Sequence, residues 1–579
     1  MHTLGINAAF HDCSAALVRD GQVVAAAEEE RFTRIKHGKR PVPFTAWQLP
    51  FHAIDYCLAE AGIRLRDVDR IAYAFDPGLL DHSAVTPEGD IRLPLEPSRA
   101  AAPEGGHSPW DPLFLSYVTN APRQLAAGAP LHLAARFEGA SLADIQDRWT
   151  FLDHHLCHEA SAYLAAPFES SAVLTMDGRG EGVTTSYGHF TGGEYTRLKQ
   201  IAMPHSLGLL YEDVTRHLGF LPASDEYKVM ALASYGKPTL YEVFRDILRL
   251  EEGGGFSLAP ARLAERLGPP RRRGGPLEER HMDIASSLQH VLEDTALAMA
   301  QWLQRQTGAD NLCMAGGVAL NCVMNARIAR DGPFDRVWVQ PAAGDAGTAL
   351  GAALYVDYRH GGGKRRWTME HAYLGPAYED DDIRQALERA HLKYRRVEDI
   401  ASATADLLAD GAVVAWFQDR MEFGPRALGA RSILASPLDP AMQARLNGLK
   451  DREDFRPVAP VVIEERAHEW FDAAGQPGIR APFMLFVYDV LPQCADRIPA
   501  VRHIDGTARV QTVRREQNPR YYDVLRAFEA RTGVPVLVNT SFNTRGQPMV
   551  CTPRDALEAF FTSPLDALAI GSYLVEKPA

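Results

Sequence analysis

The chain has 579 residues, of which 46% are hydrophobic and 23% charged, and its formal net charge is −13 at pH 7. This length exceeds what one hydrophobic core usually serves, so we expect at least two domains. The ordinary composition excludes a disordered, collagenous or coiled-coil chain. The acidic balance offers a phosphate backbone no general attraction, which disfavours nucleic acid as the partner.

The cysteines and the first residues bear on the compartment. Seven cysteines are scattered without a CxxC pair, so neither a disulfide framework nor a zinc finger is expected. The opening Met-His-Thr-Leu-Gly lacks the basic head and apolar segment of a signal peptide. No run approaches the roughly 18 apolar residues of a membrane span. We therefore expect a cytoplasmic protein without a membrane partner.

Two segments share one strand pattern. Residues 3–30 predict a β-meander from the strand-like TLGINA, AALVRD and VVAAAEEE, and the turn after the first strand carries His11 and Asp12. Residues 172–202 repeat the plan with AVLTMD, the Gly-rich turn GRGEG, VTTSYGHF and EYTRLKQIAM. The repeat predicts a duplicated architecture, with chance similarity of two hairpins as the alternative.

The segments between and after the meanders differ in pattern. Residues 86–112 and 252–278 are rich in Pro and Gly and predict loop-rich insertions. A helix from 283 to Gly308, the strand NLCMA and a second helix over 318–330 are then expected. The Gly-rich, charged residues 360–366 predict the main domain boundary.

Helical and strand-like segments alternate beyond that boundary. This alternation predicts an α/β or α+β domain of roughly 200 residues. Helices are expected over 380–392, over 399–411 and from 552, and strands over 412–419, 534–540 and 565–576.

His154 and His158 stand four residues apart in the helix-like run DHHLCHEASAY. On a helix both rings project from one face and can share a metal ion, whereas His155 would point elsewhere. The HxxxH spacing alone is a weak signal, so incidental histidines stay the alternative. Asp177 in MDGRGEG and Asp345 in AAGDAG could complete a divalent-metal site, or could equally form turns or cap helices.

The segment 418–460 concentrates cations in an acidic chain. The apolar residues between these cations favour a pocket for a small phosphorylated or carboxylated ligand, and a salt-bridged surface is the alternative. No P-loop motif occurs, but separate Gly turns could bring backbone N–H groups to phosphates. The charged residues of the segment include Arg420, Glu422, Arg426, Arg431, Arg445, Lys450, Arg452, Glu453, Asp454 and Arg456.

Taken together, these motifs resemble those of the NodU/CmcH family of O-carbamoyltransferases, which includes tobramycin, cephamycin and nodulation-factor carbamoyltransferases. The resemblance covers nearly the whole chain in order. It implies an α/β protein with a duplicated actin-like ATPase domain, similar to TsaD, over 1–365 and an α+β YrdC-like domain over 366–579. The motifs include FHDCSAALV, HHLCHEASAY, MDGRGEG, DEYKVMALASYGKP, AGGVALNCVMN, QPAAGDAGTALGAA, MEFGPRALGARSIL, LKDREDFRPVAP and VNTSFNTRGQP.

The resemblance also implies a reaction. Carbamoyl phosphate and ATP, the latter with Mg²⁺, would give carbamoyladenylate in the second domain. The carbamoyl group would then pass to a hydroxyl of a small-molecule acceptor, such as an antibiotic, a sugar or a macrocycle, in the first domain. A monomer or homodimer is expected. The implied metal is Fe²⁺, with Mn²⁺ and Zn²⁺ not excluded, on His154, His158, Asp177 and Asp345.

The family's other functional positions transfer onto this chain residue by residue. Implied carbamoyladenylate contacts are Lys36, Gly208, Gly316, Gly317 and Asn321. Implied contacts to carbamoyl phosphate or ATP are Arg426, Lys450, Arg456, Arg509, Asn539 and Ser541.

An acceptor hydroxyl needs a base within hydrogen-bond reach. Our candidate is His11, with Asp12 orienting its ring, and a turn histidine that only bonds backbone is the alternative. Two other functions stay open: a tRNA threonylcarbamoyl transferase, which the acidic net charge disfavours, and a non-enzymatic ATP-binding scaffold, which would not need the full set of ligands.

Overall fold

The computed structural model describes residues 1–38, 48–79, 111–473 and 478–577. The described residues divide into two compact units. Unit 1 comprises Met1–Ser161, Arg179–Val183 and Asp345–Arg366, and unit 2 comprises Ala162–Gly178, Thr184–Gly344 and Trp367–Ala579. The expected domains 1–365 and 366–579 stay a prediction.

Unit 1 is built on a mixed sheet in the order β3-β2-β1-β4-β5. The first three strands form an antiparallel meander, to which β4 and β5 add in parallel, so the meander predicted over 3–30 is confirmed. The strands are β1 (His2–Asn7), β2 (Ser14–Arg19), β3 (Gln22–Glu28), β4 (Arg70–Tyr73) and β5 (Trp149–Phe151).

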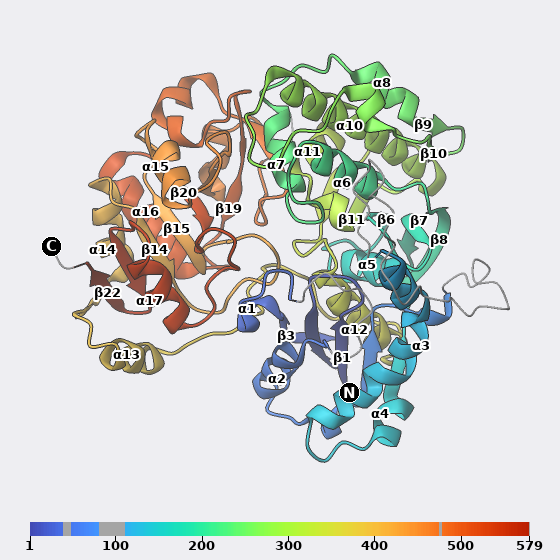
Figure 1. Cartoon of the computed structure of the whole chain (residues 1–579). Helices are drawn as coiled ribbons and strands as arrows, with labels where there is room; N and C mark the ends of the chain where they lie inside the picture. Colours follow the sequence, from blue (N-terminus) through green and yellow to red (C-terminus); the bar gives the residue numbers. More distant parts are fainter. Residues whose placement is uncertain (39–47, 80–110, 474–477, 578–579) are drawn as a thin grey trace, which may run out of the picture. The chain divides into compact units, whose positions relative to one another are not determined.

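Helices pack on the sheet of unit 1 because its strands are apolar on both faces. Leu4 and Ile6 are fully buried together with Ile54 of α2, whereas α12 packs along β1 and β2 (Figure 1). Helix α5 begins in unit 1 and ends in unit 2. The helices are α1 (Glu30–Thr33), α2 (Phe51–Glu60), α3 (Asp111–Arg136), α4 (Leu142–Arg148), α5 (His154–Tyr163) and α12 (Ala346–His360).

Two glycines allow α12 to approach its neighbours closely. A Cβ added to Gly5 of β1 would lie 1.9 Å from the carbonyl oxygen of Ala349 in α12. A Cβ added to Gly351 of α12 would lie 1.8 Å from the carbonyl oxygen of Cys157 in α5. Since both obstacles are backbone atoms, helix α12 is held between β1 and α5 at a distance that only glycine permits.

The first sheet of unit 2 repeats the plan of the sheet in unit 1. Its order is β12-β11-β6-β7-β8; β6 pairs antiparallel with β7, while β11 and β12 add in parallel to β6. The predicted duplication is therefore confirmed, and the alternative of a chance match is wrong. The strands are β6 (Ser171–Met176), β7 (Val183–Thr191), β8 (Glu194–Ala202), β11 (Asn311–Ala315) and β12 (Arg336–Val339).

The helices that accompany this sheet in unit 2 centre on α10, which packs against α7, α8 and α11. The helix expected over 318–330 begins only at Cys322, because the Asn321 side chain accepts a hydrogen bond from Met324 N and caps it. The helices are α6 (Leu207–His217), α7 (Glu226–Ala233), α8 (Tyr241–Ile247), α10 (Glu279–Thr307) and α11 (Cys322–Asp331).

The two expected insertions have different outcomes. Residues 252–278 are not only loop: β10 (Gly255–Leu258) pairs with β9 (Leu248–Glu251), and α9 (Leu263–Leu267) follows. The expected insertion over 86–112 lies outside the described residues except at its last two positions.

The C-terminal part of unit 2 is a mixed sheet in the order β13-β22-β21-β14-β15-β20-β16-β19. Trp416 and Phe417 of β14 lie in its buried core, and the α/β or α+β prediction is confirmed. Strands β17 (Val487–Asp489) and β18 (Thr507–Arg509) form a separate pair. The strands of the sheet are β13 (Arg395–Arg396), β14 (Val414–Phe417), β15 (Arg431–Ala435), β16 (Ala459–Ile463), β19 (Gln511–Val513), β20 (Val536–Ser541), β21 (Ala567–Ile570) and β22 (Tyr573–Glu576).

One strand prediction in this part is wrong. The single strand expected over 565–576 is an antiparallel hairpin of β21 and β22, because Gly571 turns the chain with φ +52. The helices around the sheet are α13 (Asp380–Arg389), α14 (Ile400–Ala409), α15 (Met442–Leu449), α16 (Pro519–Thr532) and α17 (Pro553–Phe561). In the described part of the chain, no helix combines the length and the apolar character needed to cross a bilayer.

The close approach of α12 to α5 predicts opposite effects for two helical glycines. Gly351→Ala should lower the free energy of unfolding by about 1–3 kcal/mol, because the new methyl group meets backbone. Gly448→Ala in α15, where an added Cβ meets nothing within 4 Å, should raise it by up to about 1 kcal/mol. Denaturant unfolding of both variants checks this, and equal midpoints would contradict the packing described.

Candidate functional site

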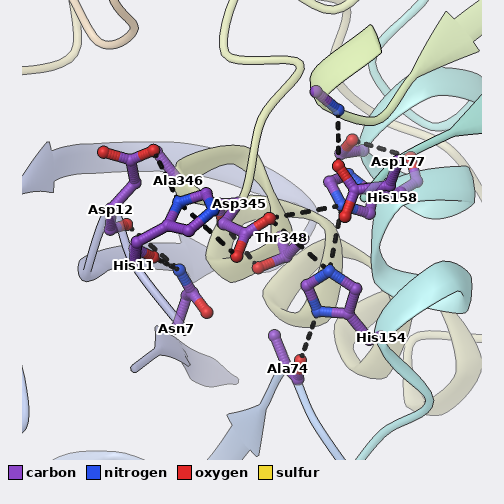
Figure 2. Close-up of polar contacts among 12 residues, drawn as sticks. Asn7, His11, Asp12, Ala74, His154, His158, Asp177, Asp345, Ala346 and Thr348 are labelled. Carbon is purple, nitrogen blue, oxygen red and sulfur yellow. Dashed lines mark hydrogen bonds and ion pairs between the residues drawn. The ribbon is translucent and has the colours of Figure 1, made fainter. Parts of the chain in front are cut away.

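Helix α5 places His154 and His158 one turn apart in unit 1 (Figure 2). Asp153, just before the helix, accepts a hydrogen bond from Leu156 N at 2.6 Å and so caps it. The Nε2 atoms of His154 and His158 are 3.2 Å apart, and both rings are fully buried. The sequence spacing therefore does bring two imidazole nitrogens together.

Asp345 immediately precedes α12, and its carboxylate lies against both rings. Its Oδ1 is 3.6 Å from His154 Nε2 and 3.8 Å from His158 Nε2 (Figure 2). Asp345 occupies the N-cap position of α12, but its side chain is 1% exposed and makes no cap hydrogen bond to the helix. Within the described ranges, neither carboxylate oxygen has a hydrogen-bond partner. A buried carboxylate in this state is costly unless a cation binds it.

The ring of His154 is oriented by a backbone carbonyl. Its Nδ1 lies 3.2 Å from the oxygen of Ala74. Because a carbonyl only accepts, Nδ1 carries the proton, and the lone pair of Nε2 faces His158 and Asp345. Metal-ligating histidines are held in this way. Two imidazole nitrogens with carboxylate oxygens fit a divalent metal such as Fe²⁺, Mn²⁺ or Zn²⁺.

Asp177, the fourth predicted ligand, belongs to unit 2 and directly follows β6. Its Oδ1 accepts a hydrogen bond from the backbone N of Gly317 at 2.7 Å (Figure 2). The preceding Gly316 has φ +89, and an added Cβ would lie 2.1 Å from the oxygen of Met176. Two of the predicted adenylate glycines therefore adjoin this carboxylate.

His11 and Asp12 lie in the turn between β1 and β2 of unit 1. The amide Nδ2 of Asn7 donates to the backbone oxygens of both residues, which holds the turn (Figure 2). His11 Nδ1 is 3.0 Å from Asp12 Oδ2 and 3.9 Å from Asp345 Oδ2, and the ring is 45% exposed. The His11 ring thus meets two carboxylates, unlike a turn histidine bonded only to backbone.

His37 is a second histidine that contacts the Asp12 carboxylate. Burial would raise the pKa of the Asp12 carboxyl, but the rings of His37 and His11 hold that pKa well below its ordinary value. The Nδ1 atom of His37 is 2.8 Å from Asp12 Oδ1. Asp12 is therefore an anion that can orient and stabilise a neighbouring imidazole.

The remaining predicted adenylate residues differ in their surroundings. Gly208 is the second residue of α6, where an added Cβ would lie 2.8 Å from the backbone of Gly178. The Asn321 side chain exchanges hydrogen bonds with Gln289 of α10 while it caps α11, so its amide already has protein partners. Lys36 belongs to unit 1, whereas the other four belong to unit 2.

In unit 2 four arginines, hereafter the arginine cluster, crowd together with little compensating charge. In the part of the chain that the structure describes, Arg426 Nε, Arg452 Nη2 and Arg509 Nε are buried and have no hydrogen-bond partner. Burial and the other guanidinium groups lower the pKa of Arg426 and of Arg452 to about 9. Because arginine stays protonated in proteins, these shifts indicate strained cations that an anion would stabilise. The cluster is Arg426, Arg452, Arg456 and Arg509.

Helix α7 is linked to the arginine cluster directly through Tyr227 and indirectly through Lys228 and Glu453. The Tyr227 ring centroid is 4.7 Å from the Arg456 guanidinium carbon. Lys228 Nζ is 2.8 Å from Glu453 Oε1, and Glu453 Oε2 is 3.7 Å from Arg456 Nη1. Sequence reasoning missed both residues, because no spacing pattern relates position 228 to position 453. The motif DEYKVMALASYGKP that contains them was the available signal.

Lys450, Asn539 and Ser541 have protein partners at the end of β20. Lys450 Nζ donates to the backbone oxygen and Oγ of Ser541 and to Asn543 Oδ1, at 2.6 to 2.9 Å. Burial, with Arg452 and Arg456, lowers the pKa of Lys450 well below its ordinary value. Asn539 Nδ2 donates to Ala427 O and Gln511 Oε1.

Other charged residues of the 418–460 segment are structural. Glu422 Oε1 accepts hydrogen bonds from the backbone N of Leu428, Ala430 and Arg431, which folds the loop that follows Arg426. Arg431 is fully buried and donates to backbone carbonyls, with its guanidinium over the Phe417 ring. The segment is therefore neither wholly a ligand site nor wholly a salt-bridged surface.

Comparisons with known proteins agree with the resemblance. A family model described as carbamoyltransferase N-terminus matches residues 2–354, and one described as carbamoyltransferase C-terminus matches residues 405–577. The chain is similar to an uncharacterized protein of Synechocystis sp., with 41% identity over 100% of this chain and 97% of that protein.

Two named relatives come from nodulating bacteria. The chain is 39% identical to nodulation protein NolNO of Sinorhizobium fredii, over 99% of this chain and 80% of the relative. It is 41% identical to nodulation protein NolO of Bradyrhizobium diazoefficiens, over 74% of this chain and 79% of the relative. With both halves matched by its models, this chain belongs to the carbamoyltransferase family of the NodU type, and it is a carbamoyltransferase enzyme.

Proposed function

We propose that this enzyme makes carbamoyladenylate from carbamoyl phosphate and ATP and transfers the carbamoyl group to a hydroxyl of a small molecule. The observation that carries the proposal is the arginine cluster, whose buried guanidinium groups repel one another. Carbamoyl phosphate is a dianion and ATP carries more negative charge still. Binding both would relieve the repulsion through charge-assisted hydrogen bonds.

The proposed activation step uses residues of unit 2. Water attacks the phosphorus of carbamoyl phosphate, the P–O bond to the carbamoyl group breaks, and inorganic phosphate and carbamate result. A carbamate oxygen then bonds to the α-phosphorus of ATP as the bond from that phosphorus to pyrophosphate breaks. Arg426, Arg456 and Arg509 would neutralise the charge that builds on the phosphoryl oxygens, with Arg452 beside them. Mg²⁺ would accompany ATP. Lys450, Asn539 and Ser541 would shape the same site from β20 and the loop after α15.

The proposed transfer step uses a metal ion held by two histidines and two aspartates. The proposed ligand set is His154, His158, Asp177 and Asp345, with Fe²⁺ as the proposed metal. A bound divalent metal would supply a Lewis acid toward the adenylate. Gly208, Gly316, Gly317, Asn321 and Lys36 are the proposed adenylate contacts.

His11 is the proposed general base of the transfer. Its ring is partly exposed, so an acceptor hydroxyl can reach it, and Asp12 would stabilise the imidazolium that forms. The proton moves from the hydroxyl to His11, the hydroxyl oxygen bonds to the carbamoyl carbon, and AMP leaves. An antibiotic, a sugar or a macrocycle is the proposed acceptor class.

A direct assay tests the activation step and the main alternatives. Purified enzyme with ATP, carbamoyl phosphate and Fe²⁺ should release pyrophosphate and form carbamoyladenylate, detected by mass spectrometry. ATP turnover that instead required threonine and bicarbonate would favour a tRNA threonylcarbamoyl transferase. Absence of any turnover would favour a binding scaffold and contradict the proposal.

Replacing a metal ligand should separate the two half-reactions. We expect His154→Ala to abolish carbamoyl transfer to an acceptor found by screening hydroxylated natural products, while pyrophosphate release continues. His360→Ala, on the exposed end of α12, is the matched control and should retain both activities. Loss of pyrophosphate release in His154→Ala would mean that the half-reactions are not assigned to separate sites.

Replacing an arginine of the arginine cluster should slow the activation step, which pyrophosphate release reports. Arg509→Ala should slow pyrophosphate release by about 10²–10³-fold, because one charge contact to the reacting phosphoryl groups is lost. Arg502→Ala, an exposed arginine in the same segment, should leave the rate unchanged. Steady-state pyrophosphate assays measure both, and equal rates for the two variants would refute the ligand role of the arginine cluster.

A further inference from the structure

Glu181 lies in the Gly-rich turn 178–182, whose residues from 179 onward belong to unit 1, and it connects two separate backbone segments. Its Oε1 accepts a hydrogen bond from Asp76 N at 2.7 Å and another from His154 N at 3.0 Å. Its Oε2 lies 3.1 Å from the same His154 N. One carboxylate thus joins the first residue of α5 to the chain just after β4.

The same two segments also hold the ring of His154. Ala74 O accepts the proton of His154 Nδ1, and Asp76, which donates to Glu181, is two residues farther along the chain. The carbonyl fixes the imidazole, and the carboxylate fixes the backbone that carries it. The ring of His154 is therefore held directly by Ala74, and its backbone N is linked to Asp76 through Glu181.

Asp153 and Glu181 act on different backbone groups at the start of α5. Asp153 accepts from Leu156 N, the third residue of the helix, and so stabilises the first turn. Glu181 accepts from the first residue, His154, and connects it to Asp76. Losing Glu181 would leave the helix capped but would free it to shift against the segment 74–76.

We propose that Glu181 is a positioning residue for the metal centre, which keeps His154 Nε2 aimed at the position shared with His158 and Asp345. This inference rests on the proposed function, because it concerns metal binding by those residues. The ligand geometry of a metal site depends on groups that orient the ligands, and losing one typically weakens metal affinity by about 10–100-fold.

The hydrogen bonds that Glu181 accepts predict how strongly each substitution at this position should weaken metal binding. The two oxygens of the Glu181 side chain face two backbone N–H groups, so both donors depend on acceptors from this one side chain. Glutamine keeps one acceptor oxygen but turns an NH₂ group toward a donor. Glu181→Ala should therefore weaken metal binding most, and Glu181→Gln less.

The test measures Fe²⁺ affinity by anaerobic isothermal titration calorimetry on the full-length enzyme without substrates. We expect Glu181→Ala to raise the dissociation constant for Fe²⁺ by about 10–100-fold. The dissociation constant of Glu181→Gln should lie between that of Glu181→Ala and that of the unaltered enzyme. Glu169→Ala, at an exposed glutamate in the connection between α5 and β6, is the control and should bind like the unaltered enzyme. Pyrophosphate release should be the same in all variants.

The outcomes are distinguishable. Unchanged Fe²⁺ affinity in Glu181→Ala would overturn the positioning role while leaving the metal centre standing. If Glu181→Ala fails to fold, as far-UV circular dichroism would show, Glu181→Gln decides by the same criterion. An unaltered enzyme that binds no Fe²⁺ would overturn the proposed metal centre and this inference with it, whatever the pyrophosphate assay shows.

Discussion

The close packing of α12 between β1 and α5 is the constraint on which the position of Asp345 beside His154 and His158 depends. Gly5 and Gly351 let the helix backbone touch a strand on one side and another helix on the other. Asp345 stands at the start of α12, and His154 and His158 stand on α5. Because interiors resist even small changes of volume, these two glycines determine how closely the carboxylate approaches the imidazoles.

Each unit buries charged groups that have few protein partners among the described residues. In unit 1 a buried carboxylate, Asp345, has imidazole nitrogens beside it and, among the residues described, no hydrogen-bond donor for either oxygen. In unit 2 burial and neighbouring guanidinium groups lower the pKa values of Arg426, Arg452 and Arg509. Burying charge is costly, so the first region suits a cation and the second suits anions.

Local spacing predicted some contacts in this protein correctly, whereas contacts between distant positions were missed. The spacing of His154 and His158 predicted their juxtaposition correctly, because helical geometry relates positions four apart. The hairpin of β21 and β22 was mistaken for one strand, since Gly571 lies within a continuous apolar run and its turn conformation depends on how the chain packs. Tyr227 and Lys228 were missed because their partners lie more than 200 positions away. Asn321 was predicted as an adenylate contact, whereas its bonds to Gln289 and its capping role became visible only in three dimensions.

By itself, the sequence determined the family, the duplicated strand plan and the residue types available for chemistry, because these depend on local periodicity and on ordered motifs. Tertiary structure alone decided which charged side chains are bound internally and which are left uncompensated. Arg431 and Arg426 are five residues apart in one motif, yet backbone carbonyls surround the first and other guanidinium groups surround the second. The same is true of Glu181, whose role depends on backbone N–H groups that carry no signature in the sequence. Long-range packing sets these environments, and no local pattern encodes it.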